Sequence, residues 1–279
     1  MSRSSISVIV LTHNSYQKKQ GCIEHTLAAL LNQRDVNHEI IVVDNDSSAQ
    51  DLEKLGDFVK TKNERVRLIA CDETVSGARN LGAGVASHEL FVFVDEDTIV
   101  LDDDALLKIS KHSLKSTHGY GALRLWTPDE PWFSLHAKQV LSDIAKKDYA
   151  FLRESSGRPA PHFRSKNTDK YLVRSFIGNF GFVQKALFEK VGGFPQNFAG
   201  YGSEDDALSF LCYHHCGKFA LISDIEVVHV SHSVEKAFFN TGPDNWNLYK
   251  EMVRSYGYSS FHIGDLLYPE IVKNRAVLE

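Results

Sequence analysis

The stretch ELFVFVDEDTIVLDDDAL (residues 89–106) runs from an apolar segment directly into six acidic residues. Residues 90–94 are all apolar, three acids follow at 95–97, and three more stand at 102–104. Like charges at this spacing repel one another unless water solvates them or a cation binds between them. The stretch therefore indicates either an ordinary loop or a cation site at the end of a buried strand.

Similar apolar runs recur through the first hundred residues and alternate with segments of helical periodicity. Continuous apolar strands separated by helices are typical of βαβ units, in which helices cover both faces of a parallel sheet. The sequence therefore predicts an α/β, Rossmann-like fold with a mainly parallel central sheet. The expected strands are 6–12, 39–45, 65–71 and 89–95, and the expected helices are 21–33, 50–60 and 76–87.

Polar residues follow three of these strands directly. Thr12 and Asn14 end the first, Asp44 and Asn45 end the second, and the acids at 95–97 end the fourth. Ligands of parallel α/β sheets bind at the carboxyl ends of the strands, which meet at one edge. These side chains are therefore expected to converge on one site.

The pattern weakens after residue 110. Segments 127–132 and 155–170 are rich in Pro, Ser and charged residues and are expected to be loops. A strand and a helix are expected within 171–194, and the loop that begins at 195 leads into another helix. Two short strands are expected within 219–233 and a helix at 244–256.

Composition excludes some functions. The chain has 279 residues, 43% of them hydrophobic, and a formal net charge of −5, which argues against broad binding of nucleic acid. No run reaches the roughly 18 apolar residues of a transmembrane segment. A cytoplasmic location is expected, with peripheral membrane association left open. The sequence does not determine the oligomeric state.

The Asp-x-Asp at the end of the fourth strand suits a divalent cation. Mg²⁺ and Mn²⁺ take carboxylate oxygens and leave further positions to substrate phosphates. Because side chains alternate along a strand, Asp95 and Asp97 are expected to face one ligand while Glu96 points elsewhere. A solvated loop without a metal would account for the same acids.

A second acidic cluster opens a predicted helix. Glu204, Asp205 and Asp206 follow Ser203, and the spacing from Ser203 to Asp206 resembles a capping box. Acids in a first helical turn are also favoured by the helix dipole. A carboxylate there that faces the edge of the sheet could instead act as a general base.

Two histidines follow a late apolar strand, and either could be a packed structural residue or a metal ligand. His229 lies within the strand and His232 lies beyond its expected end. His229 is therefore the better candidate ligand.

Taken together, the motifs resemble a family-two GT-A glycosyltransferase. SVIVLTHN, EIIVVDNDS, GARNLGA and FVFVDEDTIV stand in the order of that family's donor half. The later run from GNFGFVQKALFEKVGGF to GYGSEDDALSFL, followed by VVH, resembles the branch of galactosyltransferases, N-acetylgalactosaminyltransferases and chondroitin polymerases. The resemblance covers residues 6–233.

The resemblance implies a GT-A fold in a single domain of two abutting halves. Residues 1–110 would bind the nucleotide-sugar, residues 111–235 would bind the acceptor and carry catalysis, and residues 236–279 would form a helical extension. It also implies a UDP-sugar donor, Mn²⁺ or Mg²⁺ as cofactor, and a role in polysaccharide biosynthesis. The acceptor stays open among a glycan, a lipid-linked sugar, a peptide and a small molecule.

The resemblance assigns roles by position. Asp205 would be the base of an inverting transfer, Glu204 would orient a hydroxyl, Asp97 and His229 would hold the metal, and the remaining matched residues would contact the donor. These donor contacts are Thr12 and Asn14 beside the uracil, Asp44 or Asn45 at its edge, Arg79 over the base or ribose, Asp95 at the ribose or sugar, and Gly178 and Asn179 at the sugar pocket.

Three departures and two alternatives remain. Asn45 stands where many family members have Asp, which leaves strict uridine preference open, Tyr201 replaces a usual tryptophan, and Phe210-Leu211 stands where an Arg-Leu pair is usual. A nucleotidylyltransferase also places acids on such a sheet, but its early glycine-rich loop is missing here. A sugar- or nucleotide-binding module without turnover is the non-enzymatic alternative.

Overall fold

The computed structural model describes residues 5–62, 64–120, 123–126, 130–146, 148, 150–151, 159–160, 178–200, 202–215, 218–222, 224–230 and 236–257. Within them, a seven-stranded sheet has the order β10-β6-β9-β4-β1-β2-β3. Its strands are β1 (Ile6–Thr12), β2 (His38–Asn45), β3 (Val66–Cys71), β4 (Leu90–Asp95), β6 (His118–Tyr120), β9 (Phe180–Gln184) and β10 (Phe219–Leu221).

The pairing confirms the predicted fold class. β1 runs parallel to both β2 and β4, β2 runs parallel to β3, and the apolar segments predicted as strands form these four neighbours. β9 is antiparallel to β4 and to β6, so the sheet is mainly parallel with one reversed strand. The parallel register places the carboxyl ends of β1, β2 and β4 at one edge.

A smaller sheet carries the late histidine to the same edge. Its order is β5-β11-β7-β8, with β5 (Thr98–Val100), β7 (Leu123–Trp126), β8 (Pro159–Ala160) and β11 (Glu226–His229). β11 pairs antiparallel with β5, which sets His229 opposite Thr98. A strand from the second half of the chain is thereby fixed to the segment that follows β4.

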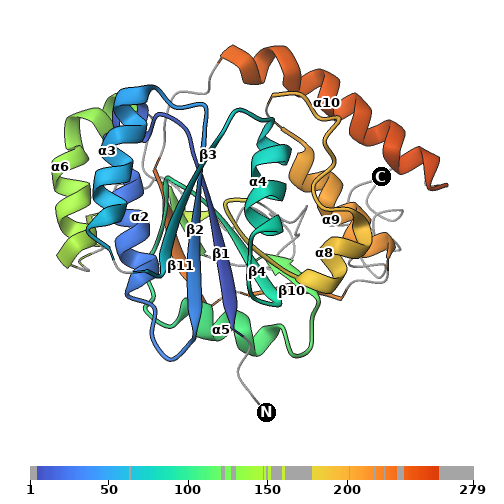
Figure 1. Ribbon diagram of the computed structural model, residues 1–279, viewed down its shortest axis with the longest axis horizontal. Coiled ribbons are helices and arrows are strands. Elements are labelled where there is room, and N and C mark those ends of the chain that lie inside the picture. Colours follow the sequence, from blue (N-terminus) through green and yellow to red (C-terminus); the bar gives the residue numbers. More distant parts are fainter. Residues whose placement is uncertain are drawn as a thin grey trace.

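Helices cover both faces of the large sheet (Figure 1). Side chains of α2, α3 and α5 pack on one face, and side chains of α4, α8 and α9 pack on the other. The helices are α1 (Ser15–Lys19), α2 (Cys22–Leu31), α3 (Ala49–Lys60), α4 (Val75–Gly84), α5 (Ala105–His112), α6 (Glu130–Lys146), α8 (Lys185–Val191), α9 (Glu204–His214) and α10 (Lys236–Ser255).

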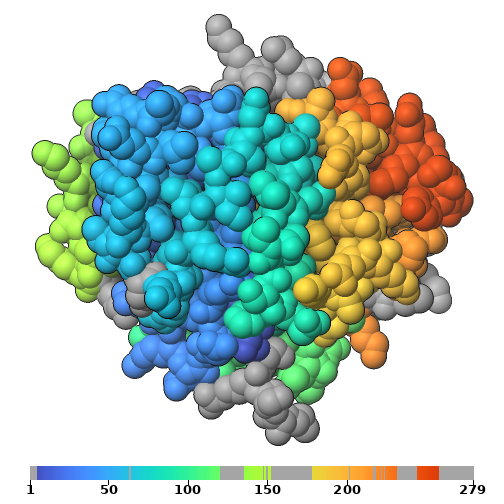
Figure 2. Space-filling model, viewed as in Figure 1, coloured from blue at the N-terminus to red at the C-terminus, as the bar shows by residue number. Residues whose placement is uncertain are grey.

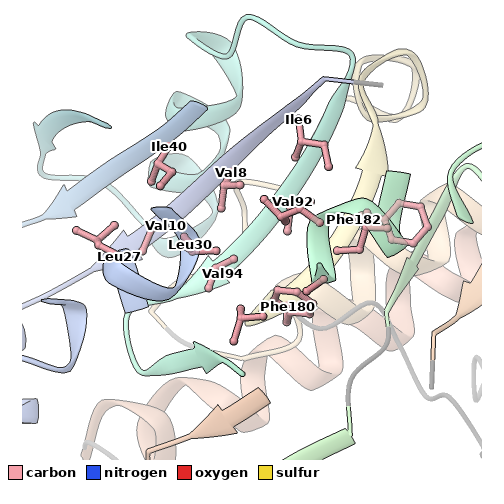
Figure 3. Packing of buried hydrophobic residues seen from close by; sticks show 14 of the residues in the cluster. Ile6, Val8, Val10, Leu27, Leu30, Ile40, Val92, Val94, Phe180 and Phe182 are labelled. Carbon is pink, nitrogen blue, oxygen red and sulfur yellow. The ribbon is translucent and has the colours of Figure 1, made fainter. Parts of the chain in front are cut away.

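Alternation along the strands divides the core into two layers. Val8 and Val10 of β1 face Leu27 and Leu30 of α2, together with Ile40 of the neighbouring strand (Figure 3). The residues between them in sequence point to the other face. Ile9 and Val43 there pack with Ala78 of α4, and Phe93 packs with Phe188 of α8.

The two halves of the chain are joined at α4. Asn80 of α4 donates from Nδ2 to the Phe194 carbonyl at 2.8 Å and accepts the Phe194 amide at Oδ1, 2.9 Å away. Figure 2 shows teal α4 beside the gold surface of α8 and α9. Beyond them, α10 packs on α9 through Tyr249 and Val253 against Phe210.

Some predicted boundaries were wrong. Residues 130–132, expected in a loop, begin helix α6, and Pro159–Ala160, inside the second expected loop, form β8. Residues 127–129 and 161–170 lie outside the described part. The late helix begins at residue 236 rather than 244. Among the described residues, no helix combines the length and apolarity required to cross a bilayer.

Gly82 permits the close approach of α4 to the sheet. A Cβ at Gly82 would lie 2.6 Å from Ile9 Cγ2 and 2.9 Å from Val43 Cγ2, whereas a Cβ at Gly84 would have no atom within 4 Å. Gly82→Ala is therefore expected to lower the free energy of unfolding by about 1–3 kcal/mol through overpacking. Gly84→Ala should raise it by about 0.5–1 kcal/mol. Urea denaturation of both variants measures this, and equal effects would contradict it.

Candidate active site

An ion-paired cluster lies where β4 ends. The Lys19 Nζ atom is 2.9 Å from Glu96 Oε1 and 3.0 Å from Asp97 Oδ2. Both carboxylates are nearly inaccessible, with Asp97 only 1% exposed. The Thr12 hydroxyl donates to Glu96 Oε2. Burial lowers the pKa of Lys19, but Asp97 and Glu96 raise it by more, so the group stays charged.

His229 faces the same carboxylate from the small sheet. Its Nε2 atom is 3.6 Å from Asp97 Oδ1. The Val230 amide donates to the Asp97 carbonyl at 2.9 Å, which fixes the backbone of both residues. Asp97 thus presents one oxygen to His229 and the other to Lys19.

Strand alternation does not extend through the acidic run, and the expectation that Glu96 points away from Asp97 was wrong. β4 ends at Asp95 and a turn follows at residues 96–97. Glu96, expected to point elsewhere, joins Asp97 at Lys19, while Asp95 binds Arg79. The turn therefore divides three consecutive acids between two cations.

Arg79 of α4 is the centre of the second cluster. Its guanidinium lies 2.7 Å from Glu204 Oε1 and 3.0 Å from Asp95 Oδ1. The side chain is buried, and its Cζ atom lies 5.3 Å from the centre of the Phe194 ring. Glu204 also accepts the Gly202 amide at 3.0 Å. Arg79 therefore connects the end of β4 to the start of α9.

Gly178 lies directly against this guanidinium. A Cβ at Gly178 would approach Arg79 Cζ to 2.6 Å, so a side chain there would force the guanidinium away from its ion pairs. The Asn179 carbonyl accepts the Asp95 amide at 3.4 Å. The Asn179 side chain is buried, and its Oδ1 atom has no hydrogen-bond partner within the described structure.

Asp205 completes the cluster. Its Oδ2 atom accepts the Gly178 amide at 3.4 Å, and its Oδ1 atom accepts the Asp206 amide at 3.0 Å. Part of the Asp205 surface reaches solvent. Its pKa lies well above the ordinary value because of burial, then because of the charges of Glu204 and Asp206, with Arg79 opposing them.

The start of α9 is not a capping box. Ser203 has φ 67°, in the left-handed region, and its side chain makes no capping hydrogen bond. Glu204, which follows it, turns toward Arg79. An ion pair with a residue 125 positions away thus replaces the local cap that the sequence predicted.

The carboxyl ends of β1 and β2 are held by hydrogen bonds between loops. Asn14, with φ 53°, accepts the Ser48 amide at its side-chain oxygen at 2.8 Å, and its own backbone amide donates to Ser47 Oγ at 2.7 Å. Asn45 accepts the Glu73 amide at 2.9 Å.

Asp44, at the end of β2, accepts the Ser47 amide at 3.3 Å. Burial raises the pKa of Asp44 above its ordinary value. These contacts shape the loops that the resemblance assigns to the base.

The predicted site residues thus fall into three adjoining groups at one edge of the sheet. Sequence reasoning missed two members: Lys19, which has no recognisable motif, and Glu96, whose direction depends on the turn. The only signal for Lys19 in the sequence was a lysine in the short segment between the first predicted strand and the first predicted helix. His232 and Tyr201 lie outside the described residues.

Two side-chain atoms at this edge are suited to bind a divalent metal. Asp97 Oδ1 and His229 Nε2 face each other, and oxygen with imidazole nitrogen is a set that Mn²⁺ accepts. Within the described ranges, no group of three or more His, Cys, Asp and Glu side chains could hold a metal. Two protein ligands fit a cation whose other positions are filled by a diphosphate.

Comparisons with known proteins agree with this geometry. The family description Glycosyl transferase family 2 matches residues 7–192. The chain belongs to glycosyl transferase family 2. A second description, N-terminal domain of galactosyltransferase, matches residues 159–233. The family-2 match supports a glycosyltransferase over a nucleotidylyltransferase.

Solved structures confirm the GT-A fold of this family-2 enzyme. TarS 1–349 of S. aureus in complex with UDP has a TM-score of 0.63 at 16% identity and covers 97% of this chain and 71% of its own. GalNAc-T7 with UDP, GalNAc and Mn²⁺ has a TM-score of 0.63 at 16% identity, and the match covers 98% of this chain and 52% of the GalNAc-T7 chain.

The mannosyltransferase PcManGT of Pyrobaculum calidifontis with GDP-Man and Mn²⁺ has a TM-score of 0.59 at 16% identity, and the match covers 96% of this chain and 70% of the PcManGT chain. At such identities the likeness establishes the fold alone. No curated protein sequence matches the chain.

Arg79→Met is expected to lower the free energy of unfolding by about 3 kcal/mol, because it leaves buried Glu204 without a counter-charge. Arg67→Met is the matched control, since Arg67 is a half-exposed arginine whose pair with Glu39 should contribute less than about 1 kcal/mol. Chemical denaturation compares the two variants. Similar small losses from both would show that the Arg79 network is not a stabilising link.

Proposed function

We propose that this glycosyltransferase moves a sugar from a UDP-sugar to an acceptor hydroxyl with inversion, using a divalent metal and Asp205 as the general base. The observation that carries the proposal is the placement of Asp205. It has a raised pKa and lies beside the Arg79 network, at the edge of the sheet where Asp97 and His229 face each other.

The donor would lie along the ends of β1, β2 and β4. Thr12, Asn14 and the Asp44–Asn45 pair would border the base, and Asp95 would contact the ribose or sugar. Arg79 is buried between two carboxylates, so it would act on the donor by holding Asp95 in place. The UDP bound by TarS and by GalNAc-T7 supports a uridine nucleotide, whereas PcManGT, with the same fold, binds GDP-Man.

The sugar pocket would be formed by Gly178 and Asn179. Gly178 brings backbone atoms close to Arg79 and Asp205 without a side chain in between. The buried Asn179 Oδ1 atom has no partner within the described residues and can accept a sugar hydroxyl. An unsatisfied buried acceptor is costly, so a ligand hydroxyl there would offset that cost.

Asp97 and His229 would hold Mn²⁺ or Mg²⁺. When bound, the metal would offset the charge that grows on the departing diphosphate. Mn²⁺ in the GalNAc-T7 and PcManGT complexes supports this choice.

Asp205 would take the proton from the acceptor hydroxyl while that oxygen bonds to the anomeric carbon. The bond from this carbon to the diphosphate oxygen breaks on the opposite face, and UDP leaves with the bonding electrons. A base works best when its pKa approaches the working pH, and the surroundings of Asp205 raise its pKa in that direction. Glu204, fixed by Arg79 and Gly202, would orient the hydroxyl.

Metal-dependent nucleotide binding tests the donor site. UDP should bind more tightly with Mn²⁺ than without it, and Asp97→Ala should remove that difference because it deletes a ligand of the metal. Isothermal titration of UDP with and without Mn²⁺ measures both. Asp103→Ala, at an exposed ion pair with Arg34, is the control and should bind as the wild type does. Metal-independent UDP binding by the wild type would contradict the metal assignment.

Asp205→Asn tests the base. The variant should bind UDP with Mn²⁺ like the wild type while turnover falls by at least about a hundredfold, within the usual contribution of a general base. Donor consumption and the anomeric configuration of the product are measured over a panel of UDP-sugars and acceptors. Asp206→Asn, in the same helical turn, is the control. Wild-type turnover by Asp205→Asn would exclude the base role.

A further inference from the structure

Lys19 is a largely buried lysine that is ion-paired with the acidic residues after β4. It is the last residue of α1, its side chain is only 15% exposed, and its Nζ atom lies within 3.0 Å of two carboxylates. The neighbouring Lys18, by contrast, is exposed. The family motifs do not account for either lysine.

The backbone around α1 holds Lys19 in this position. Asp51 of α3 accepts the Tyr16 amide at 2.9 Å, and the Tyr16 hydroxyl donates to Glu24 of α2 at 3.0 Å. After Lys19 the chain turns through Gln20 and Gly21, with φ 53° and 75°, directly into α2. The lysine is therefore tied to two helices that pack on the sheet.

We propose that Lys19 is a tethered counter-cation of Glu96 and Asp97 that keeps the affinity for a free divalent metal low until a nucleoside diphosphate binds. This proposal rests on the proposed metal position at Asp97 and His229. Its new element is Lys19, which would make the metal and the donor bind together.

The charges around Asp97 explain why Lys19 would weaken the binding of a free metal. The ammonium offsets one of the two negative charges and occupies Asp97 Oδ2, while Asp97 Oδ1 faces His229. A divalent cation at Oδ1 would lie next to the fixed positive charge of Lys19, and the low-dielectric surroundings strengthen that repulsion. The negative charges of a diphosphate would compensate it, because they attract the metal and the ammonium alike.

A purely structural role for Lys19 predicts something different. If the ammonium only neutralises buried carboxylates during folding, its loss changes stability but leaves the effect of UDP on Mn²⁺ affinity the same as in the wild type. The coupling of metal and nucleotide affinities is the readout that separates the two roles.

The test measures Mn²⁺ binding by electron paramagnetic resonance, with and without UDP. Without UDP, Lys19→Met should bind Mn²⁺ at least about tenfold more tightly than the wild type, since a neighbouring positive charge is lost. With UDP the two proteins should differ by less than about threefold, because the diphosphate supplies the compensating charge. Lys18→Met is the control and should match the wild type in both conditions.

A second variant covers failure of Lys19→Met to fold. Glu96→Gln keeps Lys19 but removes one negative charge, so Mn²⁺ binding without UDP should weaken by about tenfold or more. Lys19→Met combined with Glu96→Gln restores the wild-type charge balance and should return the affinity to near the wild-type value. Unchanged affinity in Lys19→Met, or in Glu96→Gln where the first variant does not fold, overturns the proposal.

The outcomes also separate this inference from the proposed function. Mn²⁺ binding by Lys19→Met alone, with no Mn²⁺ binding by the wild type even in UDP, supports the counter-cation and refutes metal-dependent donor binding. UDP-dependent Mn²⁺ binding that Lys19→Met leaves unchanged supports the proposed metal site and refutes the role of Lys19. No Mn²⁺ binding by either protein refutes both.

Discussion

The bridge that Arg79 forms between Asp95 and Glu204 is the constraint on which the site depends. Asp95 ends a strand of the first half of the chain, and Glu204 begins a helix of the second half. Gly178 closes against the same guanidinium and donates its amide to Asp205. Three segments that are far apart in sequence are therefore positioned by one buried cation, and the candidate base takes its place from that arrangement.

The repulsion within the acidic run is resolved by the protein itself. The turn after β4 sends Asp95 to Arg79 and sends Glu96 and Asp97 to Lys19. Each cation comes from a different helix, α4 or α1, so the run is balanced only when both helices are packed on the sheet. Charge balance at this edge therefore depends on the packing of α1 and α4 against the sheet.

The sequence predicted the fold well where one physical signal dominated. Residues 8–11 and 40–43 are continuous apolar runs that only a sheet covered on both faces can bury, and they form the middle of two central strands. Prediction failed where distant contacts overrode local rules. Ser203 lost its expected cap because Glu204 pairs with Arg79, and Lys19 could be placed only after α1 had been positioned against the sheet.

The same constraint limits the chemistry of Asp205. Burial and the neighbouring Glu204 and Asp206 raise its pKa, and Arg79 acts in the opposite sense. Arg79 is itself partly neutralised by Asp95 and Glu204, so its pull on Asp205 is weakened. A carboxyl group with a raised pKa holds a proton more strongly, which makes it a better acceptor for the proton of a sugar hydroxyl. The ion pairs that join the two halves of the fold therefore also make Asp205 suitable as a base.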